Sequence, residues 1–155
     1  AGGGQEGGYR SGTENIPYIV AFAKALRLAK EGRETRATKL YGLRERLMKG
    51  LAELPELVVN SPAQGAPHIV HFSYPGMKAE ALLHMLEEEG FFVSTRSACS
   101  SKRSEPSRIL LAMGKTKEVA SSGIRISLGD EHEERDIDAL LAALQRSVKR
   151  LQALR

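Results

Sequence analysis

The chain has 155 residues, of which 41% are hydrophobic and 27% charged, and this composition predicts one soluble globular domain with a single core. No apolar run is as long as a membrane span, and no signal-peptide pattern opens the chain. The single cysteine excludes a disulfide framework and a cysteine-based zinc site, and it fits a reducing cytoplasm. The net charge of +4 permits an acidic partner such as tRNA, but basic and acidic residues are interleaved along most predicted helices, as on solvated faces.

Residues 1–15 are rich in glycine and lead into a predicted helix. Glycine-rich segments on their own behave as coils. This segment, however, ends in polar caps and an early proline, which predict a helix start. Backbone N–H groups before a helix, together with the hydroxyls of Ser11 and Thr13, suit an anion. The spacing matches neither a Walker loop nor a dinucleotide fingerprint, so the residues alone leave a coil and an anion site as alternatives.

A helical pattern follows from Tyr18 to about Leu51, and Gly32 is a predicted break between two helices. The apolar residues recur at steps of three and four, which predicts that they face a core. The two stripes consist of Ile19, Phe22, Ala23 and Leu26 in the first helix and Leu40, Leu43, Leu47 and Leu51 in the second.

Two short strands and a helix come next. Residues 57–60 and 68–74 are predicted strands, because β-branched and apolar residues are followed by proline and glycine turns. Residues 78–89 have the pattern of an amphipathic helix. We expect Gly90 to end this helix in the left-handed conformation, which glycine adopts without strain.

The four histidines show no spacing typical of a metal site. His68 and His71 are three positions apart, so on a strand they point to opposite faces and cannot share a metal. His84 and His132 lie elsewhere without ligand spacing. We therefore predict that the chain holds no metal.

The sequence around the cysteine changes character within a few positions. Residues 91–93 predict a strand, and the small and polar residues after them predict a loop over 94–105, followed by a helix over 106–113 that ends at a glycine. A lone cysteine is usually a small buried hydrophobe, but this loop offers Cys99 no apolar neighbour after Ala98. Nearby cations favour the reactive thiolate. They are Arg96, Lys102 and Arg103.

Residues 123–129 are a third strand, in which apolar residues alternate with Arg125 and Ser127. Arg125 is either a solvent-facing arginine of a half-buried strand or a planar fork that binds a carboxylate through two hydrogen bonds. Pattern alone favours the first interpretation.

The chain closes with a basic amphipathic helix from about Glu133, which we expect to dock on the core rather than to lie on a membrane. Its apolar stripe consists of Ile137, Leu140, Leu141, Leu144, Val148 and Leu151. Short strands with intervening helices predict one small sheet covered by helices, an α+β fold.

Three segments carry a resemblance to a known family. Ser97-Ala98-Cys99-Ser100-Ser101, followed by Glu105-Pro106-Ser107, resembles the active-site loop of cysteine desulfurases of the NifS/IscS type. The glycine-rich start and the Ile-Arg-Ile-Ser-Leu-Gly strand at 124–129 resemble the same family. Its members are pyridoxal-phosphate (PLP) enzymes of the class V aminotransferase family, and they take sulfur from L-cysteine and leave alanine. The resemblance covers nearly the whole chain but only the C-terminal part of such an enzyme.

The resemblance implies a fold and a domain division. The fold would be the small C-terminal α+β domain of a fold-type I PLP enzyme, with a small mixed or antiparallel sheet covered by helices and preceded by a long linking helix. Residues 1–15 would belong to the large domain and contact the cofactor phosphate across the dimer. Residues 16–155 would form the linking helix and the small domain, with the cysteine loop at 94–105.

The resemblance also implies residue roles. Cys99 would be the nucleophile that becomes a persulfide, Arg125 would hold the substrate α-carboxylate, and Thr13 would contact the PLP phosphate of the partner subunit. No lysine of this chain has the family's Ser-x-His-Lys context, so the Schiff-base lysine is expected outside the chain, and the chain alone is expected to be inactive. Arg96 stands where many relatives have glycine, which leaves the acceptor open.

The implied protein is a cytoplasmic homodimer that acts on L-cysteine. It would pass the sulfur to an acceptor protein for iron–sulfur cluster assembly or for tRNA or cofactor thiolation, without membrane or direct nucleic-acid contact. A persulfide carrier without its own cofactor is an alternative. A basic α+β module that binds RNA is less favoured, because the four Phe and four Tyr are scattered and form no RNA-binding motif.

Overall fold

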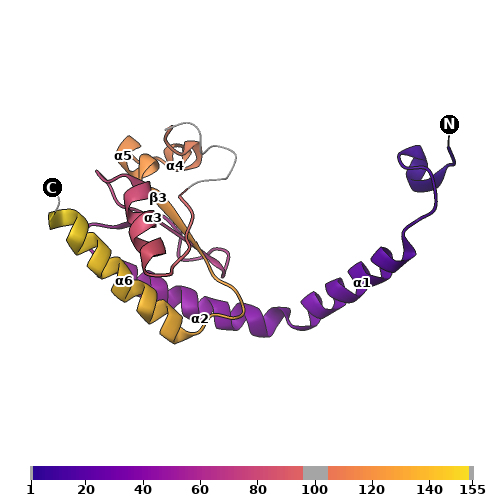
Figure 1. Cartoon of the computed structure of the whole chain (residues 1–155), viewed down its shortest axis with the longest axis horizontal. Coiled ribbons are helices and arrows are strands. Elements are labelled where there is room, and N and C mark those ends of the chain that lie inside the picture. Colours follow the sequence, from indigo (N-terminus) through magenta and orange to yellow (C-terminus); the bar gives the residue numbers. More distant parts are fainter. Residues whose placement is uncertain (1, 96–104, 154–155) are drawn as a thin grey trace. The chain divides into compact units, whose positions relative to one another are not determined.

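The computed structural model of the chain describes residues 2–95 and 105–153 (Figure 1). The chain divides into two compact units, Ala1–Arg36 and Ala37–Arg155, called here the N-terminal and the C-terminal unit. Cys99 and Arg96 lie outside the described residues. Within the described residues, no helix has the length and apolar character needed to cross a membrane.

The N-terminal unit contains a short 3-10 helix, η1 (Gln5–Gly8), and the helix α1 (Ile16–Glu31). The side chain of Asn15 caps α1 by accepting a hydrogen bond from the first turn at 3.3 Å, and Pro17 stands where its missing N–H is not needed. Helix α1 ends at Gly32, and α2 (Arg33–Ala52) begins directly after it. The predicted break at Gly32 is confirmed.

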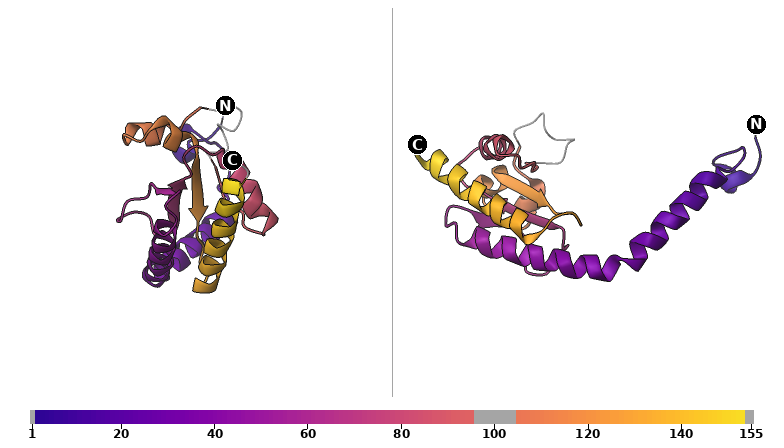
Figure 2. Two further views of the ribbon diagram at one scale, coloured as in Figure 1. Left: turned by 90° about the vertical axis from the view of Figure 1, so that its left-hand side faces the viewer. Right: turned by 60° about the horizontal axis from the view of Figure 1, so that its bottom comes forward.

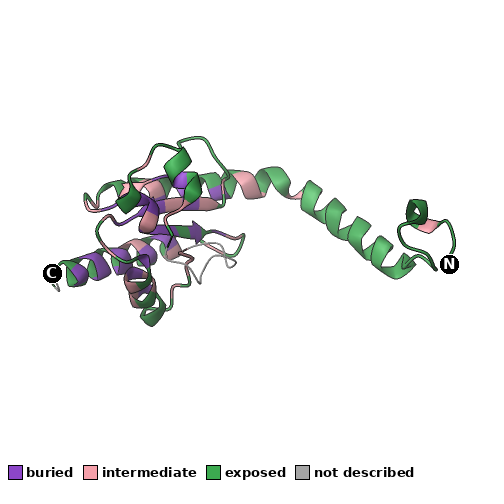
Figure 3. Cartoon of the chain, turned by 90° about the horizontal axis from the view of Figure 1, so that it is seen from above, coloured by how far each residue is buried: buried purple, intermediate pink, exposed green. Residues whose placement is uncertain are grey.

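Helix α1 buries none of its side chains (Figure 3). The prediction that Ile19, Phe22 and Leu26 face a core is therefore wrong for the described residues, where they are 52%, 71% and 60% exposed. Ala23 of the same stripe is exposed as well. The described part of the N-terminal unit has no second long element against which this stripe can pack.

The C-terminal unit holds a three-stranded antiparallel sheet with the strand order β1-β2-β3. The strands are β1 (Val58–Val59), β2 (Ile69–Ser73) and β3 (Gly123–Ser127). They confirm the strands predicted at 57–60, 68–74 and 123–129, with shorter ends. The helices around the sheet make the fold α+β, as predicted.

One face of the sheet is apolar and is the centre of the core. Its buried residues are Val70, Phe72, Ile124 and Ile126. The helices α2, α3 (Ala79–Glu88) and α6 (Glu134–Ala153) supply the other side of this core. The predicted stripes of α2 and α6 are confirmed, with Leu141 half-buried; the buried members are Leu40, Leu43, Leu47 and Leu51 in α2 and Ile137, Leu140, Leu144, Val148 and Leu151 in α6.

Helices α2 and α6 lie side by side (Figure 2). Arg46 of α2 forms hydrogen bonds at 2.6 and 2.8 Å with the carboxylate of Asp138 of α6. A Cβ atom at Gly50 would lie 2.3 Å from the nearest side-chain carbon of Leu141, so glycine allows the close approach of the two helices.

The strand predicted at residues 91–93 is not formed, and only Ser94, which follows it, bridges to β3. Helix α3 is followed by Gly90 at φ +86°, the predicted left-handed conformation. The N–H of Phe91 bonds back to the carbonyl of Leu86 at 2.8 Å. This closing turn uses the first N–H of the predicted strand, so the helix end overrides the β propensity of the residues that follow.

Two short helices lie between the cysteine segment and β3. Helix α4 (Arg108–Ala112) starts later than the predicted helix over 106–113, because Ser107 is its cap and accepts a hydrogen bond from the N–H of Leu110 at 3.4 Å. Helix α5 (Lys117–Ser121) was not predicted, since five residues are too few to show a helical period. The cap of α5 is Thr116.

An arginine is buried in the C-terminal unit. Arg44 of α2 is only 4% exposed. Its guanidinium donates to the backbone carbonyls of Pro62, Ala63 and Ile69 at 2.5, 2.9 and 3.4 Å. Arg44 therefore ties the connection between β1 and β2 to the helix.

Candidate carboxylate-binding site

Arg125 lies on the face of the sheet opposite the core. Ile124 and Ile126 are buried, whereas Arg125 and Ser127 are exposed, so the predicted alternation of β3 is confirmed. Backbone hydrogen bonds of 2.7 and 3.0 Å join Arg125 to Ser94, and the guanidinium donates to the Ser94 hydroxyl at a long 3.5 Å. No acidic side chain among the described residues forms an ion pair with Arg125. Its planar fork is therefore available to a carboxylate.

His71 lies directly opposite Arg125 on the neighbouring strand. Paired residues of antiparallel strands share a face of the sheet. On the other side of β2, the backbone N–H of Asn60 bonds to the carbonyl of His71 at 2.8 Å. Polar residues thus cross this face in one line, which we call the polar row (Asn60, His71, Arg125 and Ser94).

Hydrogen bonds fix the proton of the His71 imidazole. The hydroxyl of Ser73 donates to the carbonyl of Val119 at 2.8 Å, so its oxygen accepts from the side-chain amide of Asn60 at 2.7 Å. The same amide nitrogen donates its second hydrogen to Nδ1 of His71 at 3.1 Å. Because a neutral imidazole that accepts at one nitrogen donates at the other, the proton of His71 lies on Nε2.

The imidazole of His71 packs against Gly123 of β3. A Cβ atom at Gly123 would lie 2.7 Å from Cε1 and 3.0 Å from Nε2 of His71, so the absence of a side chain makes room for the ring. Burial and, to a smaller extent, the positive charge of Arg125 lower the pKa of His71 below its usual 6.5. The imidazole is therefore neutral at pH 7.

The segment that carries Cys99 is attached to this region at both ends. Before it, Ser94 is bonded to Arg125; after it, the N–H of Ser107 bonds to the carbonyl of Ala120 at 2.8 Å. The described structure therefore brings Arg125 next to the start of the cysteine segment. The role of Cys99 itself stays a prediction.

Thr13 belongs to the N-terminal unit. Its carbonyl accepts a hydrogen bond from the guanidinium of Arg10 at 2.7 Å, and its exposed hydroxyl has no hydrogen-bond partner among the described residues. Glu6 and Glu14 line a small pocket together with Arg10. Two carboxylates beside one arginine do not make a phosphate site by themselves, so the role of Thr13 stays a prediction.

A PLP cofactor would need more contacts than the described residues offer. Every described lysine is exposed except Lys115, which is half-buried, whereas a lysine that holds an aldehyde cofactor works in an enclosed site. The described residues fit only two contacts with the reacting system. These are the free hydroxyl of Thr13 for a phosphate and the free fork of Arg125 for a substrate carboxylate.

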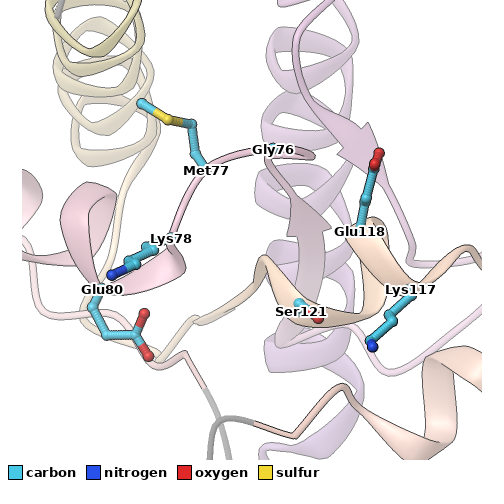
Figure 4. Close-up of a pocket in the computed structure, with 7 residues that line it drawn as sticks. All are labelled: Gly76, Met77, Lys78, Glu80, Lys117, Glu118 and Ser121. Atoms are coloured by element: carbon cyan, nitrogen blue, oxygen red, sulfur yellow. The ribbon is translucent and has the colours of Figure 1, made fainter. Parts of the chain in front are cut away.

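An open pocket lies between the start of α3 and α5 (Figure 4). The side chains of Lys78 and Glu80 lie on one side, and those of Lys117, Glu118 and Ser121 lie on the other. Both charge signs are present in equal number, and neither Arg125 nor Thr13 lines the pocket. Among the described residues, no cluster of three potential metal ligands is present. This pocket is not the predicted site.

The network of Asn60, His71 and Ser73 was missed by the sequence interpretation, which considered His71 only as a metal ligand. The signal was present in β2, where His71 and Ser73 alternate with Val70 and Phe72. Two polar residues at every second position indicate a polar face. The register that pairs His71 with Arg125 could not be read from either strand alone.

Comparison with solved structures defines the class of protein. The chain is similar to a structure titled a NifS-like protein, with a TM-score of 0.78 and 33% sequence identity over 96% of this chain and 38% of the other. The small antiparallel sheet and its helices thus belong to the kind of α+β domain that NifS-like PLP enzymes contain.

Sequence comparison gives the family. The model of the class-V aminotransferase family matches residues 3–140, so the chain belongs to this family. It is 42% identical over 152 residues to a protein named cysteine desulfurase IscS from Clostridium botulinum (strain Hall) and 41% identical over 154 residues to one of the same name from Salmonella arizonae. These two matches include 96% and 99% of the residues of this chain. The chain spans 38% of the length of either relative.

Proposed function

We propose that this chain supplies the sulfur-accepting and carboxylate-binding part of a cysteine desulfurase. The similarity to proteins named IscS supports the activity. The observation that carries the site is Arg125, whose exposed guanidinium has no acidic partner among the described residues and lies beside Ser94, shortly before Cys99.

In the proposed reaction, Arg125 binds the α-carboxylate of L-cysteine through two charge-assisted hydrogen bonds. The thiolate of Cys99 attacks the substrate sulfur, so that an S–S bond forms while the C–S bond breaks. L-cysteine and the Cys99 thiol thereby become L-alanine and a Cys99 persulfide, with no other oxidant consumed. PLP, the cofactor of this family, supplies an electron sink when bound.

Further roles rest on the same proposal. Thr13 contacts the cofactor phosphate of the partner subunit in a homodimer, and its exposed hydroxyl is free to do so. The Cys99 persulfide is passed to an acceptor protein for iron–sulfur cluster assembly or for tRNA or cofactor thiolation. We place the protein in the cytoplasm, where a single free cysteine stays reduced.

A chimera tests the nucleophile. The segment of the Clostridium botulinum relative that matches this chain is replaced by this chain, and the product is supplied with PLP and L-cysteine. We expect alanine release together with a mass increase of one sulfur atom on the peptide that contains Cys99. The Cys99→Ser chimera should keep the cofactor absorbance but form neither product at a comparable rate, because serine is a far poorer nucleophile at neutral pH.

Two results would contradict the assignment. Alanine release by Cys99→Ser at the rate of the unmodified chimera would remove Cys99 from the reaction. Persulfide on Cys99 of this chain after treatment with a small persulfide donor, together with a chimera that binds PLP but releases no alanine, would instead support the carrier alternative.

A further inference from the structure

The polar row contains a group that the proposed reaction does not use. His71 faces Arg125 across paired strands, and its proton lies on Nε2 because Asn60 donates to Nδ1. In the described residues, Nε2 has no hydrogen-bond partner. The ring rests against Gly123, the neighbour of Arg125 on the same face of β3, so the free N–H lies on the Arg125 side of β2.

His71 and Arg125, on adjacent strands, thus place two N–H donor groups close together on the face of the sheet opposite the core. Arg125 contributes a permanent positive charge, and His71 contributes a neutral donor that the Asn60–Ser73–Val119 chain of hydrogen bonds holds in place. Such a pair matches the two oxygens of a carboxylate, which accept several hydrogen bonds.

We propose that His71 and Arg125 form one carboxylate-binding site, in which His71 is the second donor and, when the anion binds, takes up a proton at Nδ1 as the Asn60 amide turns its otherwise unpartnered Oδ1 toward the ring. This inference deepens the proposed function. The claim that the bound carboxylate is that of L-cysteine rests on the proposed function. It makes substrate binding sensitive to pH through a residue of the sheet rather than through the substrate or Cys99.

The coupling follows from the charges that act on His71. Among the described residues, Arg125 of β3 is the charged group whose field reaches the imidazole, while Asn60 and Gly123, which contact the ring, are uncharged. A carboxylate bound to Arg125 cancels part of that field, so the pKa of His71 must rise. By linkage, carboxylate affinity then increases as the pH falls through the titration range of His71.

NMR titration of the four histidines of this chain tests the coupling. The pKa of His71 is measured in acetate and in chloride at equal ionic strength, with His68, His84 and His132 as internal references. Acetate should raise the pKa of His71 alone. The substitution Arg125→Gln should raise the pKa of His71 in the absence of acetate, because the nearby positive charge is removed, and it should abolish the response to acetate. Arg46→Gln, which removes an arginine paired with Asp138 on α2, is the matched control and should leave both results unchanged.

Each outcome decides the proposal. An acetate response of His71 that disappears in Arg125→Gln supports it. No acetate-specific response, or a response that persists in Arg125→Gln, overturns it. In a second measurement, His71→Gln, which keeps a neutral N–H donor, should retain acetate-induced chemical-shift changes at the Arg125 guanidinium, and His71→Phe should lose most of them. Because none of these readouts involves turnover, they remain interpretable if the Cys99 persulfide is not found.

Discussion

Arg125 differs from three other described arginines of the C-terminal unit, which already have strong hydrogen-bond partners. Arg46 is bonded to Asp138, Arg146 to Glu89, and buried Arg44 to backbone carbonyls. Toward the residues that the structure describes, the guanidinium of Arg125 has only the long contact with the Ser94 hydroxyl. A guanidinium on the middle residue of β3, without a carboxylate partner among the described residues, keeps its strongest hydrogen bonds for a ligand.

Replacing Arg125 by lysine should weaken substrate binding in the chimera. A lysine keeps the charge but loses the planar fork, so we expect the binding of L-cysteine to weaken by about 1–3 kcal/mol. The fold should survive, because residue 125 is exposed and its backbone bonds to Ser94 do not depend on the side chain. The measurement is the Michaelis constant for L-cysteine together with kcat.

Arg46→Lys serves as the control for that measurement, since Arg46 is an exposed arginine distant in sequence from β3. An unchanged KM and kcat in Arg125→Lys would return Arg125 to the role of a solvent-facing strand residue.

In β3, sequence periodicity predicted correctly which side chains are exposed, but it did not predict their partners on the neighbouring strand. The alternation in β3 correctly placed Arg125 on the open face. It could not show that His71 stands opposite, because a strand pattern contains no register. The pattern also could not show that Gly123 leaves room for the imidazole of His71, because this contact exists only when β2 and β3 are paired.

At the scale of elements, the connection between β1 and β2 depends on one side chain of α2. Arg44 donates to two carbonyls of that connection and to the carbonyl of the first residue of β2, and Tyr41 adds a hydrogen bond from its hydroxyl to the carbonyl of Gly65 at 3.3 Å. These bonds satisfy backbone acceptors that β1 and β2 leave unpaired.

Arg44→Met should lower the stability of the C-terminal unit. Methionine fills much of the space of the arginine stem but removes three partly buried, charge-assisted hydrogen bonds, so we expect the free energy of unfolding to fall by about 1–3 kcal/mol. Urea denaturation followed by circular dichroism measures the change. Arg46→Met on the exposed side of the same helix is the control and should have a much smaller effect, because exposed ion pairs contribute little. Equal losses in the two variants would show that Arg44 does not hold the connection.

The long helices were predicted well from sequence, whereas one short helix was missed. Helices α2 and α6 have 20 residues each, long enough for the apolar stripe to repeat. Helix α5 has five residues, and its only local signal was the cap Thr116. The failed strand at 91–93 shows the opposite error, because strong β propensity there was outweighed by the turn at Gly90.

For the whole molecule, the two units differ in how they are stabilised. All residues of the hydrophobic core lie between Leu40 and Leu151, inside the C-terminal unit. The described residues of α1 contribute none. The exposed apolar stripe of α1 is the part of the fold that the sequence predicted least well, because periodicity identifies an apolar face but not the surface that covers it.

A chain that begins at Arg33 should therefore fold by itself. It keeps α2 complete and retains every core residue, so its free energy of unfolding should stay within about 0.5 kcal/mol of that of the whole chain. Urea denaturation of both chains, followed by circular dichroism, makes the comparison. A lost or clearly weakened cooperative transition in the shorter chain would show that residues 1–32 take part in folding.

The contact between α2 and α6 has a consequence for biosynthesis. Gly50 and Leu141 touch, yet the ribosome adds them far apart in time. At ordinary elongation rates the delay is on the order of ten seconds. Until α6 has emerged, the leucines of α2 remain in water, where they are a target for chaperones that recognise apolar segments. The core therefore closes late, and premature termination anywhere between these helices yields a product with an open hydrophobic surface.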